Sequence, residues 1–202
     1  MKEYRKIDTC FLRDDHKKII EGSWTKPEFE FLKDNKWLWL RKIDGTNMRI
    51  IWDGQTVHIL GKTDDAQFVP EFMSKMKSIF TPDRLKSVFG TTFVILYGEG
   101  YGLLINDKGK YYYTDANFIL FDCLINNFWL QRHSLEDITK KLGIGLVDII
   151  RIGTLQEAVE FTRNIKNDKE NYLEGIVLKP LVDLIDRKGE RIITKIKRRD
   201  FI

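Results

Sequence analysis

The chain has 202 residues and a net charge of +4, with 43% hydrophobic and 32% charged residues. This length supports one sizeable core, and the composition excludes an intrinsically disordered or membrane-embedded chain. Its apolar stretches are too short to cross a bilayer, so we expect no membrane partner. Residues 1–8 do not resemble a secretory leader, and we interpret Cys10 and Cys123 as reduced core thiols of a cytoplasmic protein.

The first elements along the chain are a hairpin and a helical segment. Residues 47–60 form two β-rich arms around Asp53 and the glycine after it, a pair typical of a tight turn between strands. Residues 70–90 have helical spacing, with Thr81 as a predicted N-cap and Gly90 as the stop. We expect them to make one helical segment.

Strands are predicted to follow this helical segment. Residues 92–105 return to a strand pattern interrupted by three glycines, and a turn at 106–109 leads into a further strand at 110–114. Residues 117–125 are too continuously apolar for a strand with one wet face. We therefore predict a central strand there, buried on both faces.

The last third of the chain predicts two capped helices and two closing strands. Ser134 is the expected N-cap of a helix over residues 133–143, and Thr154 that of a helix over 153–165, each with an acid three residues later. The closing strands are expected at 173–180 and 191–200. Hairpin-joined strands with inserted helices predict a single α+β domain built on antiparallel sheets.

Charged residues occur within five of the strand-like segments, where apolar residues are the rule. They are Lys42 and Asp44, Glu99, Asp122, Glu174, and Lys195 with Lys197. Burying such a set costs free energy unless it binds something charged. The set is typical of a site for a ligand that contains both phosphates and a metal ion.

The order of these motifs resembles that of the covalent nucleotidyltransferases, the superfamily of ATP-dependent DNA ligases, RNA ligases and capping enzymes. The motifs are K-I-D-G-T-N from Lys42, G-E-G around Glu99, the pair Phe121–Asp122, E-G-I-V-L-K from Glu174, and K-I-K from Lys195. A lone K-x-D-G is weak evidence, whereas five motifs in order are specific. Asn47 is more similar to RNA ligases, the small bacteriophage-type enzymes above all, than to DNA ligases. The resemblance implies an ATP-grasp-like adenylation domain.

The resemblance assigns the phosphate chemistry to three lysines and a glutamate. Lys42 would attack the α-phosphate of ATP to form a lysyl-adenylate. A lysine with an ordinary pKa of about 10.4 is protonated at neutral pH, so nearby cations and partial burial must favour its neutral form. Lys195 and Lys197 would contact the α-phosphate, and their i, i+2 spacing places both on one face of a strand. Glu174 would bind Mg²⁺ or Mn²⁺.

The resemblance assigns nucleoside binding to other residues. Glu99 would accept hydrogen bonds from the ribose hydroxyls, and Phe121 would stack on adenine, although the residues alone equally allow Phe121 to be plain core. Asp44 and Asn47 would shape the turn behind the nucleophile, where Gly45 lets the backbone approach phosphate closely.

Three more residues are expected at the nucleotide. Arg41 precedes the nucleophile where relatives often have glutamate, so its backbone would serve adenine recognition, and Ile43 follows the nucleophile. Lys62 stands where small phage-type ligases tend to have arginine. If Lys62 contacts ribose or an incoming 5′-phosphate, it does so as a point charge, without the bidentate fork of arginine.

The implied activity is ATP-dependent joining of 3′-hydroxyl and 5′-phosphate ends in a nicked or bridged duplex of RNA, DNA or both. We expect residues 1–202 to be a monomeric catalytic domain without a C-terminal oligonucleotide-binding or helical domain, acting in the cytoplasm, that of a host cell if phage-encoded. Seven of the thirteen residues from Arg187 to Arg199 are basic and suit backbone binding. A minimal DNA ligase, a capping-type guanylyltransferase and an inactive nucleic-acid-binding module remain as alternatives.

Overall fold

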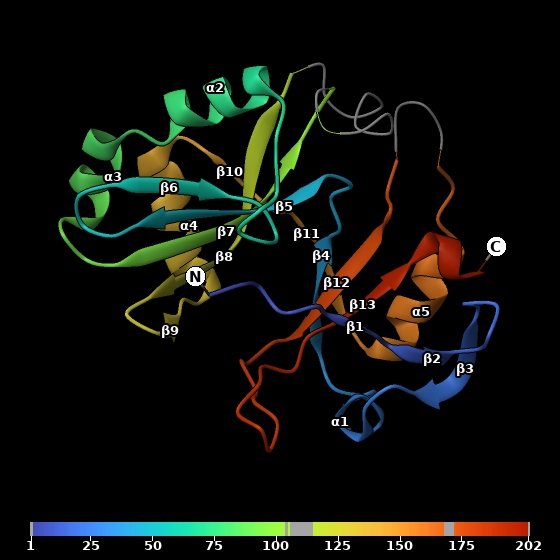
Figure 1. Ribbon diagram of the computed structural model, residues 1–202. Helices are drawn as coiled ribbons and strands as arrows, with labels where there is room; N and C mark the ends of the chain where they lie inside the picture. The colour runs from blue at the N-terminus through green and yellow to red at the C-terminus, as the bar shows by residue number, and fades with distance from the viewer. Residues whose placement is uncertain (1, 104, 106–114, 168–171, 202) are drawn as a thin grey trace. The chain divides into compact units, whose positions relative to one another are not determined.

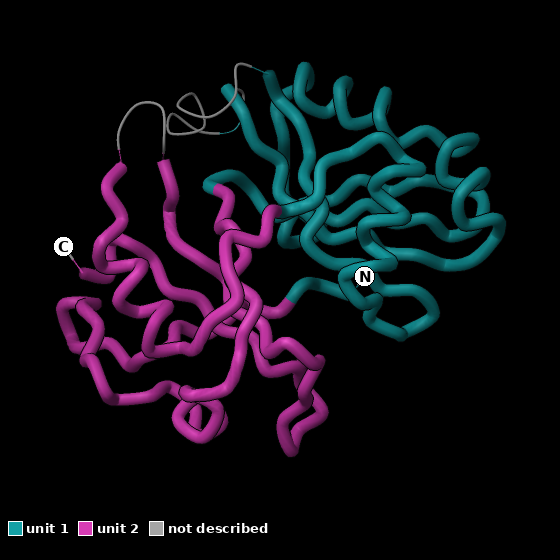
Figure 2. Tube along the Cα trace, turned by 180° about the vertical axis from the view of Figure 1, so that it is seen from behind, with its two compact units in different colours: residues 1–4, 44–147 teal, residues 5–43, 148–202 magenta. Residues whose placement is uncertain are grey.

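The computed structural model describes residues 2–103, 105, 115–167 and 172–201, so the turn expected at 106–109 and the strand expected at 110–114 lie outside the described residues. The chain folds into two compact units, each assembled from separate chain segments (Figure 2). Unit 1 comprises residues 1–4 and 44–147, and unit 2 comprises residues 5–43 and 148–202. No helix in the described part is long and apolar enough to span a bilayer.

Unit 1 is built on a six-stranded sheet whose order is β10-β8-β7-β5-β6, with β9 paired to β8 (Figure 1). The sheet is antiparallel except for the parallel pair of β10 and β8. Its strands are β5 (Thr46–Trp52), β6 (Val57–Leu60), β7 (Val94–Tyr101), β8 (Asn117–Ile125), β9 (Phe128–Trp129) and β10 (Gly145–Leu146). Its helices are α2 (Pro70–Ile79), α3 (Pro82–Phe89) and α4 (Arg132–Leu142).

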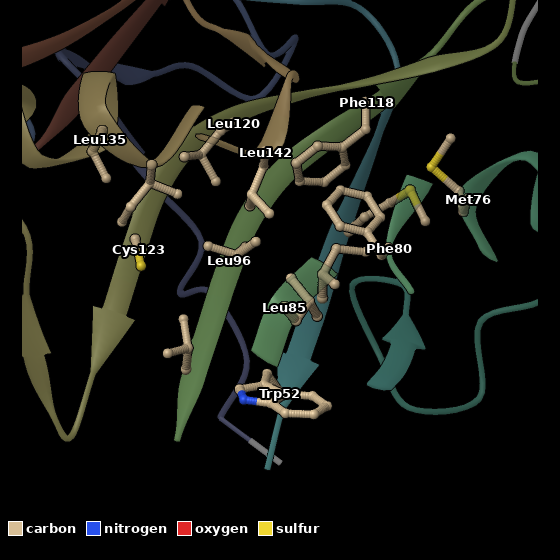
Figure 3. Packing of buried hydrophobic residues seen from close by; sticks show 14 of the residues in the cluster. Trp52, Met76, Phe80, Leu85, Leu96, Phe118, Leu120, Cys123, Leu135 and Leu142 are labelled. Carbon is tan, nitrogen blue, oxygen red and sulfur yellow. The ribbon is translucent and has the colours of Figure 1, made fainter. Parts of the chain in front are cut away.

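One face of this sheet packs against the three helices. Alternating residues of β5, β7 and β8 point into this core, as their two-residue side-chain period requires. Phe80 and Phe118 meet edge to face, with ring centroids 5.0 Å apart. Figure 3 shows both rings among the leucines of the strands and helices. The buried core is Met48, Ile50, Trp52, Phe72, Met76, Phe80, Leu85, Val94, Leu96, Phe118, Leu120, Cys123, Leu135, Ile138 and Leu142. The residues that alternate with these core residues along the strands point to the opposite face of the sheet.

Unit 2 contains a five-stranded sheet of order β1-β13-β12-β4-β11 and a separate hairpin of β2 and β3. Its strands are β1 (Asp8–Thr9), β2 (Phe11–Arg13), β3 (Ile19–Trp24), β4 (Trp37–Arg41), β11 (Ile149–Gly153), β12 (Gly175–Pro180) and β13 (Thr194–Lys197). Its helices are α1 (Pro27–Phe31), α5 (Leu155–Arg163) and the 3-10 helix η2 (Arg198–Phe201). Trp37 and Trp39 of β4 and Ile196 of β13 pack with Leu155 and Val159 of α5. Ile176 and Leu178 of β12 belong to the same core, and the side chains that alternate with these residues along the strands face away from α5.

Most of the predicted elements are confirmed. The hairpin around Asp53 joins β5 and β6, Thr81 caps α3, and Gly90 ends it. β8 lies inside its sheet and is buried on both faces, as its continuous apolar pattern predicted. The chain has an α+β fold of mainly antiparallel sheets, to which the short parallel pairs β1/β13 and β10/β8 are additions.

Two local predictions were wrong. The segment 70–90 forms two helices, because the chain leaves helical geometry at Phe80 and Thr81 starts a new helix. The N-cap of α4 is Gln131, so Ser134 lies inside the first turn. Ser134 has the right side chain for a cap, but the backbone already turns helical at Arg132, whose guanidinium donates to the Val147 carbonyl oxygen at 2.6 Å.

The cap of α5 provides a stability prediction. Thr154 Oγ1 accepts from the Glu157 backbone N–H at 3.1 Å, and the Glu157 carboxylate accepts from the Thr154 N–H at 2.7 Å. We expect Thr154→Ala to lower the free energy of unfolding by about 1 kcal/mol in a urea titration. The exposed Thr91→Ala is the control, with an expected change within about 0.5 kcal/mol. Equal effects of the two substitutions would contradict the capping role.

Candidate active site

A cluster of lysines around one glutamate lies on unit 2. Lys42 follows β4 directly, and its backbone N–H donates to the Gly175 carbonyl oxygen at 3.0 Å. Glu174 directly precedes β12, and β12 pairs with β4 on one side and β13 on the other (Figure 1). The pairing places Gly175 opposite Lys197 and Val177 opposite Lys195. The sheet register therefore gathers residues that are more than 150 positions apart in the sequence.

Glu174 binds two lysines at once. Its Oε2 accepts from Lys42 Nζ and its Oε1 accepts from Lys197 Nζ, each at 2.6 Å. The side chain of Lys42 is 20% exposed, that of Glu174 11% and that of Lys197 14%. The three charged groups are therefore shielded but still accessible to solvent. We call Lys42, Glu174, Lys195 and Lys197 the lysine cluster.

The charges of the lysine cluster shift two pKa values. Burial alone would raise the pKa of Glu174, but the neighbouring Lys42 and Lys197 outweigh burial and hold it below its ordinary value. Burial and the repulsion from Lys197 and Lys42 lower the pKa of Lys195 to about 8. The cluster therefore carries more positive charge than one glutamate neutralises, which suits it to bind an anion.

The backbone at the C-terminal end of β13 is held by two hydrogen bonds. Ile196 lies between them and packs into the core, so Lys195 and Lys197 point to the opposite face. The Arg198 N–H donates to the Glu174 carbonyl oxygen at 2.9 Å, and the Lys197 N–H donates to the buried carboxylate of Asp200 at 3.0 Å. Asp200, which also pairs with Arg13, was missed by the sequence reasoning, although it follows the K-I-K motif by only three residues.

Gly175 is required by the close approach of β12 to β13. A Cβ on Gly175 would lie 2.2 Å from the Ile196 carbonyl oxygen and 2.7 Å from the Lys197 Cα. We expect Gly175→Ala to lower the free energy of unfolding by about 2 to 3 kcal/mol, because these are backbone atoms that cannot rotate away.

Urea unfolding of this variant beside Gly145→Ala measures the effect. A Cβ on Gly145 would come no closer than 3.3 Å, and only to the side chain of Ile119. Gly145→Ala should therefore cost less than about 1 kcal/mol. A Gly175→Ala protein as stable as the wild type would show that this contact is wrong.

Unit 1 carries a second group of predicted site residues on the sheet face opposite the helices. Asn47 on β5 pairs in register with Glu99 on β7. Met48 packs into the core beside Asn47, and a Cβ on either neighbour of Glu99, Gly98 or Gly100, would strike core side chains. Asn47 and Glu99 therefore share the other face.

The surroundings of Asn47 and Glu99 are close-packed. Asn47 Oδ1 is buried and has no hydrogen-bond partner among the described residues. A Cβ on Gly45 would lie 2.2 Å from the Gly100 carbonyl oxygen and 2.9 Å from the Glu99 Cγ. A glycine at position 45 thus lets the backbone approach β7 closely. This is a second reason for glycine at this position, beside the close approach to phosphate that the sequence led us to expect.

Phe121 lies in a bulge of β8, where Tyr97 pairs with Asp122 and Gly98 pairs with Leu120. Its half-buried ring meets Tyr4 edge to face, with centroids 5.0 Å apart, and Tyr4 also contacts Tyr97. Because Tyr97 and Glu99 are two residues apart on one strand, Phe121 lies on the same sheet face as Glu99.

Tyr4 also holds the buried Asp122, to which its hydroxyl donates at 2.7 Å. Asp122 lies 118 positions further along the sequence, so no local pattern singled Tyr4 out. Asp122 itself therefore has a structural partner, in addition to its place in the Phe121–Asp122 motif.

Three of the remaining predicted site residues, Arg41, Ile43 and Asp44, lie within two positions of Lys42 in the chain. The Arg41 side chain faces Asp148, with Nε 3.6 Å from Oδ2, and its backbone N–H donates to the Asp148 carbonyl oxygen. Ile43 and Asp44 are half-buried. Ile43 is the last residue of the first segment of unit 2, and Asp44 is the first residue of the second segment of unit 1. Lys62 is exposed in the turn that follows β6.

The basic run from Arg187 to Arg199 is not one surface. Arg187 and Lys188 lie in a turn closed by Asp186, whose carboxylate accepts from the Lys188 and Glu190 backbone N–H groups. Lys195 and Lys197 belong to the lysine cluster. The Arg198 side chain donates to the Ile165 carbonyl oxygen at 2.8 Å. The basic side chains of this run therefore have different local surroundings.

Known structures share this fold. An apo mutant of the Naegleria gruberi RNA ligase matches with a TM-score of 0.65 and 18% identity, covering 87% of this chain and 53% of that one. A second mutant of that enzyme, with AMP and Mn, matches with a TM-score of 0.64 and 18% identity over 85% and 52%. An archaeal ATP-dependent RNA ligase matches with a TM-score of 0.65 and 15% identity over 100% and 49%.

The chain thus spans about half the length of these structures. A comparison with curated protein sequences gives no match. The RNA ligase family model matches residues 35–197, which include Lys42, Glu99, Phe121, Glu174 and both lysines of β13. This chain belongs to the RNA ligase family.

Proposed function

We propose that this protein is an ATP-dependent polynucleotide ligase that joins 3′-hydroxyl and 5′-phosphate ends through an AMP attached to Lys42. The observation that carries the proposal is the contact of one carboxylate, that of Glu174, with Lys42 and Lys197 at 2.6 Å each. Membership of the RNA ligase family supports the same reaction. Because the chain spans about half of its structural neighbours, the activity of the whole protein is part of the proposal.

ATP and a divalent metal ion are the proposed cofactors. Neighbouring RNA ligase structures contain AMP with Mn, or ATP with Mn. In this chain Glu174 offers hard carboxylate oxygens, and Mg²⁺ characteristically takes one or two carboxylates, the substrate phosphates and several waters. Glu174 is assigned as the protein ligand by the resemblance, and the described ranges contain no group of three or more His, Cys, Asp or Glu residues that could hold a metal ion. When bound, the metal ion supplies positive charge to the phosphates.

In the first step, the Lys42 amine attacks the α-phosphorus of ATP. A nitrogen–phosphorus bond forms, the bond to the pyrophosphate oxygen breaks, and the amine loses a proton to solvent. Lys195 and Lys197 offset the charge that develops on the α-phosphate, the kind of assistance that usually contributes most to catalysis. At pH 7 a lysine with a pKa of about 8 still carries its charge, so Lys195 is suited to this role.

The next steps transfer and release AMP. A 5′-phosphate oxygen of the polynucleotide attacks the AMP phosphorus and displaces Lys42, and the 3′-hydroxyl then attacks the activated 5′-phosphate and expels AMP. Phosphate contacts of this kind do not depend on base sequence. The exposed Lys62 is assigned to the ribose or to this 5′-phosphate.

The nucleoside of ATP is assigned to Glu99, for the ribose hydroxyls, and to Phe121, for stacking on adenine. The half-buried ring of Phe121 packs against Tyr4 in an edge-to-face contact, which favours a fixed position of the ring. The buried Oδ1 of Asn47 supports a ligand role, since buried polar atoms normally have a partner. Asp44, Ile43 and the Arg41 backbone complete the proposed set.

The proposed polynucleotide is a nicked or bridged duplex with RNA on at least one side of the junction, bound by a monomer. Asn47 in the K-I-D-G-T-N motif favours RNA over DNA by resemblance. Two buried free thiols, Cys10 and Cys123, favour a reducing compartment such as the cytoplasm.

The test is a sealing assay with ATP, Mg²⁺ and nicked duplexes in which the 3′-hydroxyl and 5′-phosphate strands are independently RNA or DNA. We expect sealing of a nick with RNA on one side. Sealing of all-DNA nicks alone would make this a DNA ligase, and labelling by GTP instead of ATP a guanylyltransferase. Duplex binding without any nucleotide adduct would identify a binding module and overturn the proposal.

A further inference from the structure

Arg49 is a fully buried charge outside the lysine cluster. It lies on β5 between Met48 and Ile50, which point into the helix-covered core, so its own side chain faces the other way. Its exposed fraction is 0%. A buried guanidinium is stable only when its donors are satisfied by acceptors, ideally with a negative charge among them.

Two partners of Arg49 in the described part of the chain, Gly61 and Asp64, lie on either side of Lys62. Its Nε donates to the Gly61 carbonyl oxygen at 2.9 Å, and its Nη2 donates to the Asp64 Oδ1 at 2.8 Å. Gly61 follows directly after β6, which pairs with β5, so the guanidinium reaches across the end of the neighbouring strand. The hydrogen bond from Arg49 lowers the pKa of Asp64, which keeps that carboxylate charged.

The turn that Arg49 holds is compact. The Ala66 N–H donates to the Thr63 carbonyl oxygen at 3.4 Å. A Cβ on Gly61 would lie 2.4 Å from the Ala66 Cβ and 3.1 Å from the Phe68 ring, so the chain folds back closely on itself. Lys62 nevertheless remains exposed. Its backbone is therefore fixed while its ammonium group faces solvent.

We propose that Arg49 is a positioning residue for Lys62, acting through the turn of residues 61–64. The inference rests on the proposed function, in which Lys62 contacts the ribose or the incoming 5′-phosphate. A lysine is a point charge on a flexible stem, whereas arginine has a planar fork that fixes its own geometry at a ligand. The position of the lysine charge therefore depends more strongly on where its backbone is held. Arginine is required at position 49 because a planar fork can bind a carbonyl oxygen and a carboxylate at the same time, whereas a lysine ammonium is a single centre.

A double-mutant cycle tests this role. Arg49→Lys, Lys62→Ala and the double variant are compared in the rate of AMP labelling, the KM for ATP and the rate of AMP transfer to a nicked duplex. We expect Arg49→Lys to impair the same step as Lys62→Ala, by about tenfold. In the Lys62→Ala background, Arg49→Lys should change that step less than about twofold, because the two residues act as one unit.

Arg84→Lys is the matched control. Arg84 also lies in unit 1, and its guanidinium donates to two backbone carbonyl oxygens, those of Ile79 and Leu142. We expect Arg84→Lys to leave labelling and transfer unchanged. Multiplicative losses in the Arg49 and Lys62 cycle, or an equal loss in Arg84→Lys, would overturn the positioning role.

Two further measurements keep the inference testable. If Arg49→Lys unfolds, Asp64→Ala removes one of the two anchors and should give a loss of about threefold in the same step. Hydrogen exchange of the amides of residues 61–66 reports the turn without any reaction, and should be faster in Asp64→Ala than in Arg84→Lys. Equal exchange would overturn the anchoring. A wild-type protein that forms no AMP adduct but shows the exchange difference would overturn the proposed function alone.

Discussion

Lys42→Ala should abolish formation of the protein–AMP adduct, lowering the labelling rate by at least about 10³-fold. The physical reason is that the substitution removes the nucleophilic side-chain amine. The backbone of residue 42 is held at the end of β4 by its hydrogen bond to Gly175, and no solvent group can replace an amine placed by this backbone. Intact-mass spectrometry after incubation with ATP and Mg²⁺ measures the adduct. Lys42→Arg should behave in the same way, since a guanidinium stays protonated.

The controls separate loss of the nucleophile from loss of the fold. Glu174 keeps its contact with Lys197 in Lys42→Ala, so we expect the thermal midpoint to remain close to that of the wild type. The exposed Lys36→Ala, in the same unit, should label normally. An adduct that persists in Lys42→Ala and maps to Lys195, whose pKa burial and Lys197 still lower in this variant, would contradict the assignment.

Glu174→Gln should lower the labelling rate by roughly 100-fold. Glutamine keeps the size of the side chain but removes its charge, so Lys42 and Lys197 lose the carboxylate that each contacts at 2.6 Å. Removing the one carboxylate leaves the charges of both shielded lysines without a counter-charge. The substitution also removes the proposed metal ligand, so half-maximal labelling should require a higher Mg²⁺ concentration.

Labelling measured over a titration of Mg²⁺ and of Mn²⁺ tests this prediction. Glu160→Gln on α5 is the matched control, because its carboxylate is exposed and lies outside the lysine cluster. The control should follow the wild type at every metal concentration. A Glu174→Gln protein with normal labelling and an unchanged metal dependence would show that Glu174 neither binds the metal nor orients Lys42.

The local signals in the sequence predicted much of the fold because they act over a few residues. The turn at Asp53, the cap at Thr81 and the capping box at Thr154 each depend on contacts within about four positions. Ser134 shows the limit of such signals, since a good capping residue is overridden when the helix already starts before it.

The site shows the same division. The spacing of Lys195 and Lys197 predicted a shared strand face, and the register of β12 with β13 agrees. Arg49 was overlooked, although a charge inside the apolar run of β5 is the same kind of signal that singled out Asp122. Its partners, like those of Tyr4 and Asp200, are set by tertiary folding, and a single sequence does not specify which distant residues will meet.

The central claim is that Lys42 carries AMP to a polynucleotide end, and one two-stage measurement tests it most directly. The wild-type chain is incubated with ATP and Mg²⁺, freed of nucleotide, mapped by peptide mass spectrometry, and then mixed with a 5′-phosphorylated nicked duplex without ATP. We predict one AMP on Lys42, followed by its loss and sealing of the nick. An adduct at another residue, or an adduct on Lys42 that the nick does not discharge, would contradict the account.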